Sequence, residues 1–255
     1  MDEILIDVVD AVRRVQLNRP DKKNAITAAM YDRLATALRT SNDDAGTRVV
    51  LLTGAGDTFT AGNDVRDFLE HPPQAADSPA FRFMRAITSL EKPLVAAVHG
   101  AAIGIGTTML FHCDLVYAAE GTRFQMPFVN LGLVPELGSS LTVPALVGHQ
   151  RASALLLLGQ PFDAQAACAM GLVNEVVKAD ELVDRAMAAA QALAVHPPTA
   201  VRLTKALLKR NAAQALDRTL GEEAALFVQR LVSPEAKEAF SAFLEKRKPD
   251  FSRVE

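Results

Sequence analysis

The chain has 255 residues, of which 49% are hydrophobic and 22% charged, with a formal net charge of −3. These values are typical of a soluble globular protein, and the slightly negative charge disfavours nucleic-acid or anionic-membrane partners, which favour basic surfaces. The two cysteines, Cys113 and Cys168, have no paired spacing, and the N-terminal MDEILIDVVD is acidic, unlike a signal peptide. We therefore expect a cytoplasmic protein with reduced thiols and no membrane partner.

The first half of the chain alternates apolar runs with amphipathic segments. Two paired strands are expected at residues 4–10 and 12–18, and then a helix over residues 24–39 with Thr27 as candidate N-cap. A second helix is expected at residues 81–91, after a loop at 71–79. Buried parallel strands are predicted for RVVLLTG, PLVAAVHG and DLVYAAE, with a glycine-rich turn and a helix ending near His112 before the last. The repetition predicts α/β architecture.

From about Asp163 the pattern is mostly helical, interrupted by one short strand in LVNEVV. The His196-Pro197-Pro198 sequence separates two helical periods, and prolines are tolerated at a helix start. We therefore place a boundary there, between residues 1–195 and residues 196–255. The leucines of the tail need a cover, either the chain's own core or a neighbouring subunit: Leu203, Leu207, Leu208, Leu216 and Leu220.

Two glycine-rich segments follow buried strands, TGAGDTFTAGNDV at 53–65 and HGAAIGIGTTM at 99–109. The first could be a plain surface connection, and it is not a P-loop because it lacks a Gly-Lys-Ser/Thr ending. The second lacks the full dinucleotide-binding fingerprint. Exits from parallel strands lie on the same edge of a sheet, so the two segments could instead converge with free backbone N–H groups at a helix start.

Glu136 is the one charged residue between Arg123 and His149, and it directly follows Pro135. It could be a solvated turn residue, since Pro-Glu is common in turns. Alternatively it is a desolvated carboxylate with a raised pKa, able to accept and return a proton. The sequence alone leaves both interpretations open. The consecutive His112, Cys113 and Asp114 point in different directions on a helix or strand, so we expect no metal site there.

Taken together, several motifs resemble the crotonase, or enoyl-CoA hydratase/isomerase, superfamily along nearly the whole chain. They are LNRPDKKNAIT, FTAGNDV, KPLVAAVHGAAIGIG, CDLVYAAEGTRFQMPFVNLGLVPE, GLVNEVV and FLEKRKPDF. The resemblance implies a spiral of ββα units over residues 1–195, forming an acyl-CoA-binding core. It also implies a helical trimerisation region over 196–255, with assembly as a homotrimer or a dimer of trimers.

The resemblance also assigns residues to a site. The backbone N–H groups of Asn63 and Ile105 would form an oxyanion hole for the thioester carbonyl of an acyl-CoA. The expected substrate-binding residues are Ala61, Gly62, Asp64, Val65, Phe128, Leu131 and Leu133. The coenzyme A thioester is the substrate, and neither a cofactor nor a metal is expected. Candidate contacts for the coenzyme A phosphates are Lys22, Lys23, Lys246 and Arg247.

Within this superfamily, hydratases use two glutamates, and the matching positions here hold Thr108 and Phe128. Glu136 in LGLVPELGSS is similar to the single glutamate of Δ3,Δ2-enoyl-CoA isomerases. The resemblance thus implies that Glu136 moves a 3-enoyl-CoA double bond to the 2-trans position, as in β-oxidation of unsaturated fatty acids. The alternatives are a weak hydratase, an isomerase of ring-derived CoA thioesters, or an acyl-CoA-binding protein without catalysis.

Overall fold

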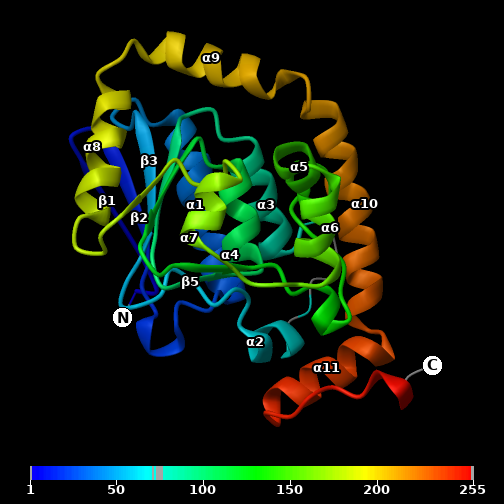
Figure 1. The fold of residues 1–255 in the computed structure, drawn as a ribbon. Helices are drawn as coiled ribbons and strands as arrows, with labels where there is room; N and C mark the ends of the chain where they lie inside the picture. Colours follow the sequence, from blue (N-terminus) through cyan, green and yellow to red (C-terminus); the bar gives the residue numbers. More distant parts are fainter. Residues whose placement is uncertain (1, 71, 73–76, 254–255) are drawn as a thin grey trace.

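The computed structural model describes residues 2–70, 72 and 77–253 (Figure 1). The loop expected at 71–79 therefore lies partly outside the described residues. A six-stranded sheet forms the centre of the molecule, in the order β1-β2-β3-β4-β6-β9. β1 is antiparallel to β2, and the other neighbours are parallel. The strands are Ile4–Val9, Val12–Leu17, Val49–Gly54, Leu94–Val98, Leu115–Ala119 and Glu175–Val177.

Helices cover both faces of this sheet. Successive side chains of a strand point to opposite faces, so Val49 and Leu51 of β3 pack with α8 (Leu182–Ala194), whereas Val50 and Leu52 belong to the larger core. That larger core contains α1 (Ala28–Asp43) and α3 (Pro79–Thr88), which pack against each other. Thr27 caps α1, because its hydroxyl accepts a hydrogen bond from the Met30 N–H at 3.3 Å.

A second, small sheet includes part of the second glycine-rich segment and pairs with the first one. It contains β5 (Ala101–Ile103), β7 (Arg123–Gln125) and β8 (Phe162–Asp163). β5 replaces part of the turn that we expected after β4. Thr60 bridges to Ala102 in parallel, and the Phe59 N–H donates to the His99 carbonyl at 2.8 Å. The two glycine-rich segments therefore run side by side.

The chain turns into a helix directly after β5. The helix expected to end near His112 is a single α-turn, α4 (Ile105–Thr108), followed by a 3-10 helix, η2 (Met109–His112). The remaining shorter elements are η1 (Pro20–Lys22), α2 (Val65–Glu70), η3 (Val129–Leu131), α5 (Ser139–Val147), α6 (His149–Leu157), α7 (Ala164–Ala169) and η4 (Phe251–Arg253).

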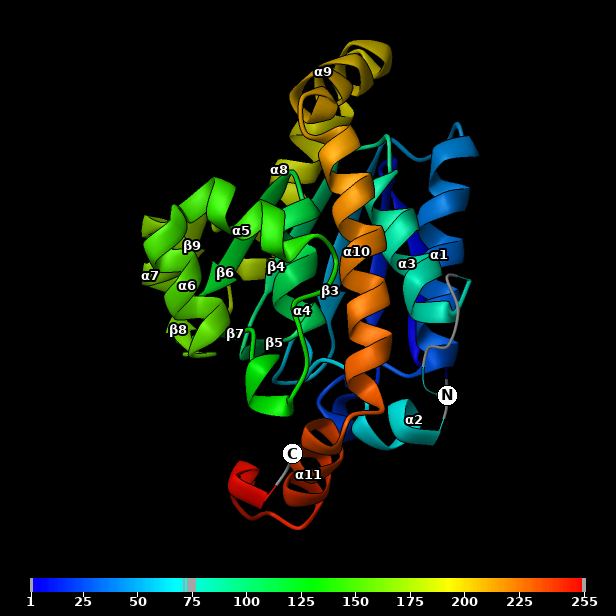
Figure 2. The ribbon, with the colours of Figure 1, turned by 90° about the vertical axis from the view of Figure 1, so that its right-hand side faces the viewer.

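The three C-terminal helices are α9 (Pro198–Arg210), α10 (Ala213–Leu231) and α11 (Pro234–Leu244). α9 lies at one end of the molecule, α10 runs back along its side, and α11 ends at the opposite end (Figures 1 and 2). Phe227, Leu231 and Phe240 belong to the same core as α1 and α3. Among the described residues, no helix is both long and apolar enough to span a membrane.

Candidate functional site

A cavity of about 930 Å³ opens between the glycine-rich segments and the C-terminal helices. Its apolar end is formed by α2, α10 and α11, and it includes Phe68, Phe227, Phe240, Phe243 and Leu244. The structure places every oxyanion-hole and substrate-binding residue suggested by the sequence in the wall of this cavity: Ala61, Gly62, Asn63, Asp64, Val65, Ile105, Phe128, Leu131 and Leu133. Residues that are far apart in the chain thus surround one space large enough for a small organic ligand.

Two backbone N–H groups at this cavity have no hydrogen-bond acceptor among the residues that the structure describes. Asn63 pairs in parallel with Ile26. In this pairing the Ile26 N–H donates to the Gly62 carbonyl and the Asp64 N–H donates to the Ile26 carbonyl, so the Asn63 N–H takes no part. Ile105 is the first residue of α4, where an N–H has no helical acceptor. Within the described ranges, neither N–H donates a hydrogen bond. Both remain available to an oxygen acceptor in the cavity.

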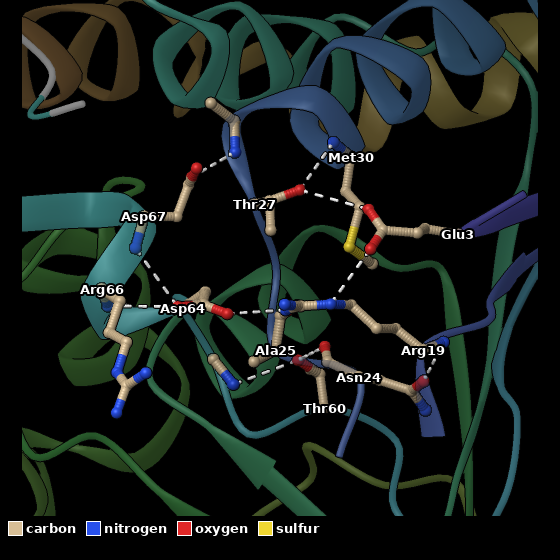
Figure 3. A network of polar contacts seen from close by, with 12 residues as sticks. Glu3, Arg19, Asn24, Ala25, Thr27, Met30, Thr60, Asp64, Arg66 and Asp67 are labelled. Carbon is tan, nitrogen blue, oxygen red and sulfur yellow. Dashed lines mark hydrogen bonds and ion pairs between the residues drawn. The ribbon is translucent and has the colours of Figure 1, made fainter. Parts of the chain in front are cut away.

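A polar network fixes the segment that carries Asn63 (Figure 3). The guanidinium of Arg19 lies between the carboxylates of Asp64, at 2.7 Å, and Glu3, at 3.0 Å. The Asp64 carboxylate also accepts from the Arg66 and Asp67 N–H groups at the start of α2. These contacts lower the pKa of Asp64, although burial opposes them. Asp64 therefore acts as a structural anchor for the donor segment as well as a residue of the cavity wall.

Asn24 holds the same segment from the other side. It is fully buried, and its amide donates to the carbonyls of Ala55 at 2.8 Å and Thr58 at 2.7 Å. Thr60 donates to the Asn24 carbonyl and accepts from the Gly62 N–H. The position of the Asn63 N–H is thus set by neighbours at both ends of the segment.

Glu136 is buried, with 2% of its surface exposed, in the loop between η3 and α5. The interpretation of Glu136 as a solvated turn residue is therefore wrong. Burial raises the pKa of Glu136 to about 8; the hydrogen bond from Thr108 lowers it and the charge of Glu223 raises it. The Thr108 hydroxyl donates to Oε1 of Glu136 at 2.6 Å. Around neutral pH this carboxyl can exchange a proton, as an acid–base catalyst requires.

Glu136 does not itself line the cavity, but it contacts the turn that carries Ile105. Thr108, its hydrogen-bond donor, is the last residue of the helical turn that begins at Ile105. On the other side, the Tyr31 hydroxyl donates to Oδ1 of Asn63. Burial raises the pKa of Tyr31 well above its ordinary value, and the charge of Glu136 adds to this effect. Glu136 is therefore hydrogen-bonded to the turn that carries Ile105, and its charge acts on Tyr31, the side chain that is bonded to Asn63.

The other candidate residues have structural partners. His112 is buried with its pKa lowered to about 4, so it is neutral, and its Nε2 lies 2.8 Å from the Leu137 carbonyl. Asp114 pairs with Lys205 at 2.7 Å. Among the described residues, no group of three His, Cys, Asp or Glu side chains is arranged to hold a metal ion.

The four basic residues suggested for the coenzyme A phosphates are not equivalent. Lys22 lines the cavity, whereas Lys23 and Lys246 are outside its wall. Arg247 pairs with the carboxylates of Glu238 and Glu245, and these contacts raise its pKa. Only Lys22 is thus placed to reach a ligand in this cavity of a single chain.

Sequence reasoning missed two residues around Glu136. Tyr31 reads as part of the apolar face of α1, and its hydroxyl gives no signal in the sequence. Glu223 did leave a signal, because it falls on the apolar stripe of α10 together with Leu216, Leu220, Phe227 and Leu231. A carboxylate at helical spacing within such a stripe indicates a buried acid with a specific partner.

The chain also resembles proteins of known family. Residues 7–253 match the family model described as enoyl-CoA hydratase/isomerase. The enoyl-CoA delta isomerase 2 of Homo sapiens is 32% identical over 253 residues, covering 96% of this chain and 64% of that protein. The chain thus spans about two thirds of the length of that relative. The 1,2-epoxyphenylacetyl-CoA isomerase of Escherichia coli is 36% identical over 261 residues, covering 99% of both chains.

A solved structure gives the same result for the fold. The enoyl-CoA hydratase/isomerase from Pseudoalteromonas atlantica T6c superposes with a TM-score of 0.93 at 41% identity, covering 98% of this chain and 100% of that one. The expected α/β class with a helical C-terminal region is therefore confirmed. The chain thus belongs to the enoyl-CoA hydratase/isomerase, or crotonase, family.

Proposed function

We propose that this enzyme isomerises a 3-enoyl-CoA to the conjugated 2-trans-enoyl-CoA, with Glu136 as the proton shuttle. One observation carries the proposal: the buried carboxyl of Glu136, with a pKa of about 8, accepts a hydrogen bond from Thr108 in the turn that begins at Ile105, while position 128 holds a phenylalanine. A hydratase of this family needs acids at those two positions to hold and activate water. The shuttle of one proton between two carbons needs only one acid.

The chemistry begins with polarisation of the thioester carbonyl by the N–H groups of Asn63 and Ile105. These donors stabilise the negative charge that develops on the oxygen, and each is worth about 2.7–4 kcal/mol in comparable sites. Ionised Glu136 then removes the proton at the alpha carbon, giving a dienolate. The protonated carboxyl returns this proton at the gamma carbon, so that the double bond moves and no cofactor or water is consumed.

Apolar residues around the site favour this route over hydration. Phe128, Leu131 and Leu133 line the cavity, and Leu137, beside Glu136, is buried. Such a lining disfavours water near the dienolate and disfavours the charged form of the carboxyl. The basic residues Arg19, Lys22 and Arg66 also line the cavity. Because Arg19 is held by Glu3 and Asp64, Lys22 and Arg66 are the better placed to meet the coenzyme A moiety.

The test supplies a 3-enoyl-CoA and follows the absorbance of the conjugated thioester. We expect the wild-type enzyme to produce this absorbance, and Glu136→Gln to lower kcat by about 10²–10⁴-fold, the usual contribution of a general acid–base. Glu222→Gln is the matched control, because it removes an exposed carboxylate on α10. Wild-type turnover by Glu136→Gln would show that the base is a different group.

A second candidate is an isomerase of ring-derived CoA thioesters. The relative named 1,2-epoxyphenylacetyl-CoA isomerase favours it, as does the run of phenylalanines at the apolar end of the cavity. A comparison of kcat/KM for aliphatic 3-enoyl-CoA and cyclic CoA thioesters separates the two. Binding of both substrate classes without turnover would instead favour the non-catalytic acyl-CoA-binding protein.

A further inference from the structure

Glu223 is a buried carboxylate that the proposed proton transfer does not use. It lies in the middle of α10, between Leu220 and Phe227 on the helix face that packs into the core, and 6% of its surface is exposed. Burial raises its pKa, whereas hydrogen bonds from Ser140 and Gly138 lower it. A buried carboxylate is costly unless it is paired or hydrogen-bonded, so its partners indicate its role.

The partners of Glu223 are the backbone of the turn that follows Glu136. Its Oε2 accepts from the Gly138 N–H at 2.6 Å, and its Oε1 accepts from the Ser140 N–H at 2.8 Å. Gly138 is the N-cap of α5 and has no side chain with which to cap it. Glu223 therefore supplies the missing cap from a helix more than 80 residues further along the chain, where a negative charge is also favoured by the helix dipole.

The turn that Glu223 holds has an unusual backbone. Leu137 has a φ of +57° and Gly138 a φ of +70°, two successive left-handed residues directly after Glu136. A left-handed leucine is strained, because its Cβ lies too close to the following carbonyl oxygen, so the turn needs external support. Besides Glu223, His112 contacts the Leu137 carbonyl, and the Ser139 hydroxyl donates to the Glu136 carbonyl at 2.7 Å.

We propose that Glu223 is a positioning residue for Glu136, holding the 136–140 turn through its two amide contacts so that the Glu136 carboxylate faces Thr108 and the donor segments. The proposal rests on the proposed function of Glu136. It links α10 to the part of the cavity that contains the two N–H donors. The same helix also reaches the apolar end of the cavity through Phe227, one helical turn after Glu223.

Glu223 has an electrostatic effect in addition to the geometric one. The ionisable groups that bear on Glu136 are Glu223 from α10 and Tyr31 from α1, while Thr108 donates its hydrogen bond and His112 is neutral. The charge of Glu223 raises the pKa of Glu136, so removal of that charge must lower it. Geometry and charge can therefore be separated by two different substitutions.

Glu223→Gln removes the charge and leaves a single oxygen for two N–H donors. We expect kcat to fall about 10- to 100-fold with little change in KM, since small displacements of a reacting group cost this much. We also expect the pKa of Glu136, measured by NMR of ¹³C-labelled glutamate carboxyls and assigned with Glu136→Gln, to fall. Glu223→Asp keeps the charge but shortens the side chain, so kcat falls while the pKa of Glu136 stays near the wild-type value.

Glu222→Gln is the control, since it neutralises the preceding, exposed carboxylate of the same helix, and it should match the wild type in both measurements. A Glu223→Gln enzyme with wild-type kcat and a wild-type pKa of Glu136 would overturn the proposal. If Glu223→Gln does not fold, Glu223→Asp tests the proposal instead. Unaltered kcat and unaltered amide exchange at Gly138 and Ser140 would overturn the proposal, whereas faster exchange with a lower kcat would support it.

The carboxyl titration and the amide exchange require no isomerase activity. If the wild type does not convert any 3-enoyl-CoA, the proposed function fails, while a lower pKa of Glu136 and faster exchange of the two amides in Glu223→Gln still establish the link between the two acids. The failure of one proposal is therefore distinguishable from the failure of the other.

Discussion

At the scale of single residues, the Thr108 hydroxyl and the burial of Glu136 act in opposite directions on the same carboxyl. Burial disfavours the ionised form, and the hydrogen bond from Thr108, at 2.6 Å, favours it. Thr108 occupies a position at which hydratases of the family have an acid, and here its hydroxyl donates a hydrogen bond to Glu136. The balance between the two effects sets the pH range in which Glu136 is ionised.

The expected pH dependence follows from this balance. For the wild type, kcat/KM for a 3-enoyl-CoA should rise with pH and level off above about 8, since only ionised Glu136 accepts a proton. Thr108→Val keeps the shape but removes the donor, so the pKa of Glu136 should rise and the profile should move to higher pH. Thr219→Val, which removes a hydroxyl bonded within α10, should leave the profile in place. An unchanged profile in Thr108→Val would contradict the role of this hydrogen bond.

At the scale of elements, the segment containing Gly62 packs tightly against the end of strand β5, close to the two N–H donors. Gly62 has a φ of +87°, and a Cβ there would lie 2.7 Å from the Ile103 carbonyl oxygen, two residues before Ile105. Any side chain at position 62 therefore has to push the two donor segments apart. The spacing of the donors depends on this glycine.

We expect Gly62→Ala to lower kcat/KM by about tenfold or more, because loss of one oxyanion donor costs on the order of 10²–10³ in related sites. Gly121→Ala is a matched control: its φ is +79°, but a Cβ there meets nothing within 4 Å. Both variants carry the strain of a left-handed alanine, so both should lose stability in thermal unfolding. Only Gly62→Ala should also lose activity, and equal activities would refute the role of donor spacing.

The same elements show how much could be predicted from the sequence. The sheet strands and α1 follow from periodicity, and the cavity residues 61–65 and Ile105 follow from the family motifs. β5, β7 and β8 are two or three residues long and depend on neighbours far along the chain, such as the Thr60–Ala102 bridge. The partners of Glu223 are equally remote in sequence, so its role depends on a tertiary contact that no local pattern specifies.

At the scale of the whole molecule, α9 attaches to the body through its polar face and presents leucines outward. Lys205 is buried and pairs with Asp114, while Lys209 donates to the Thr88 carbonyl at 3.3 Å. On the other face, Leu207 and Leu208 are 58% and 80% exposed. A surface helix usually packs through its apolar face and exposes its polar face, whereas α9 does the opposite. This arrangement supports the proposal that a second copy of the chain covers the leucines in a trimer.

Light scattering coupled to gel filtration should therefore give a mass of about three chains of 27.4 kDa, or of about six if two trimers associate. Replacement of both leucines, Leu207→Asp with Leu208→Asp, should shift the protein to a smaller species because it places charges in the covered face. Val183→Asp, at an exposed apolar residue of α8, serves as the comparison and should keep the larger mass. A monomeric wild type would disprove the trimer.

The burial of Glu136 affects both the pH at which this residue ionises and the stability of the folded protein. Its folded-state pKa of about 8 lies above the ordinary value of 4.5, so the native chain holds this proton more tightly than the unfolded chain does. The contribution to stability is complete below the ordinary pKa and is lost as the pH rises through about 8. Under the proposed mechanism the same ionisation makes Glu136 a base, so we expect activity to be highest in the pH range where this residue favours the native state least.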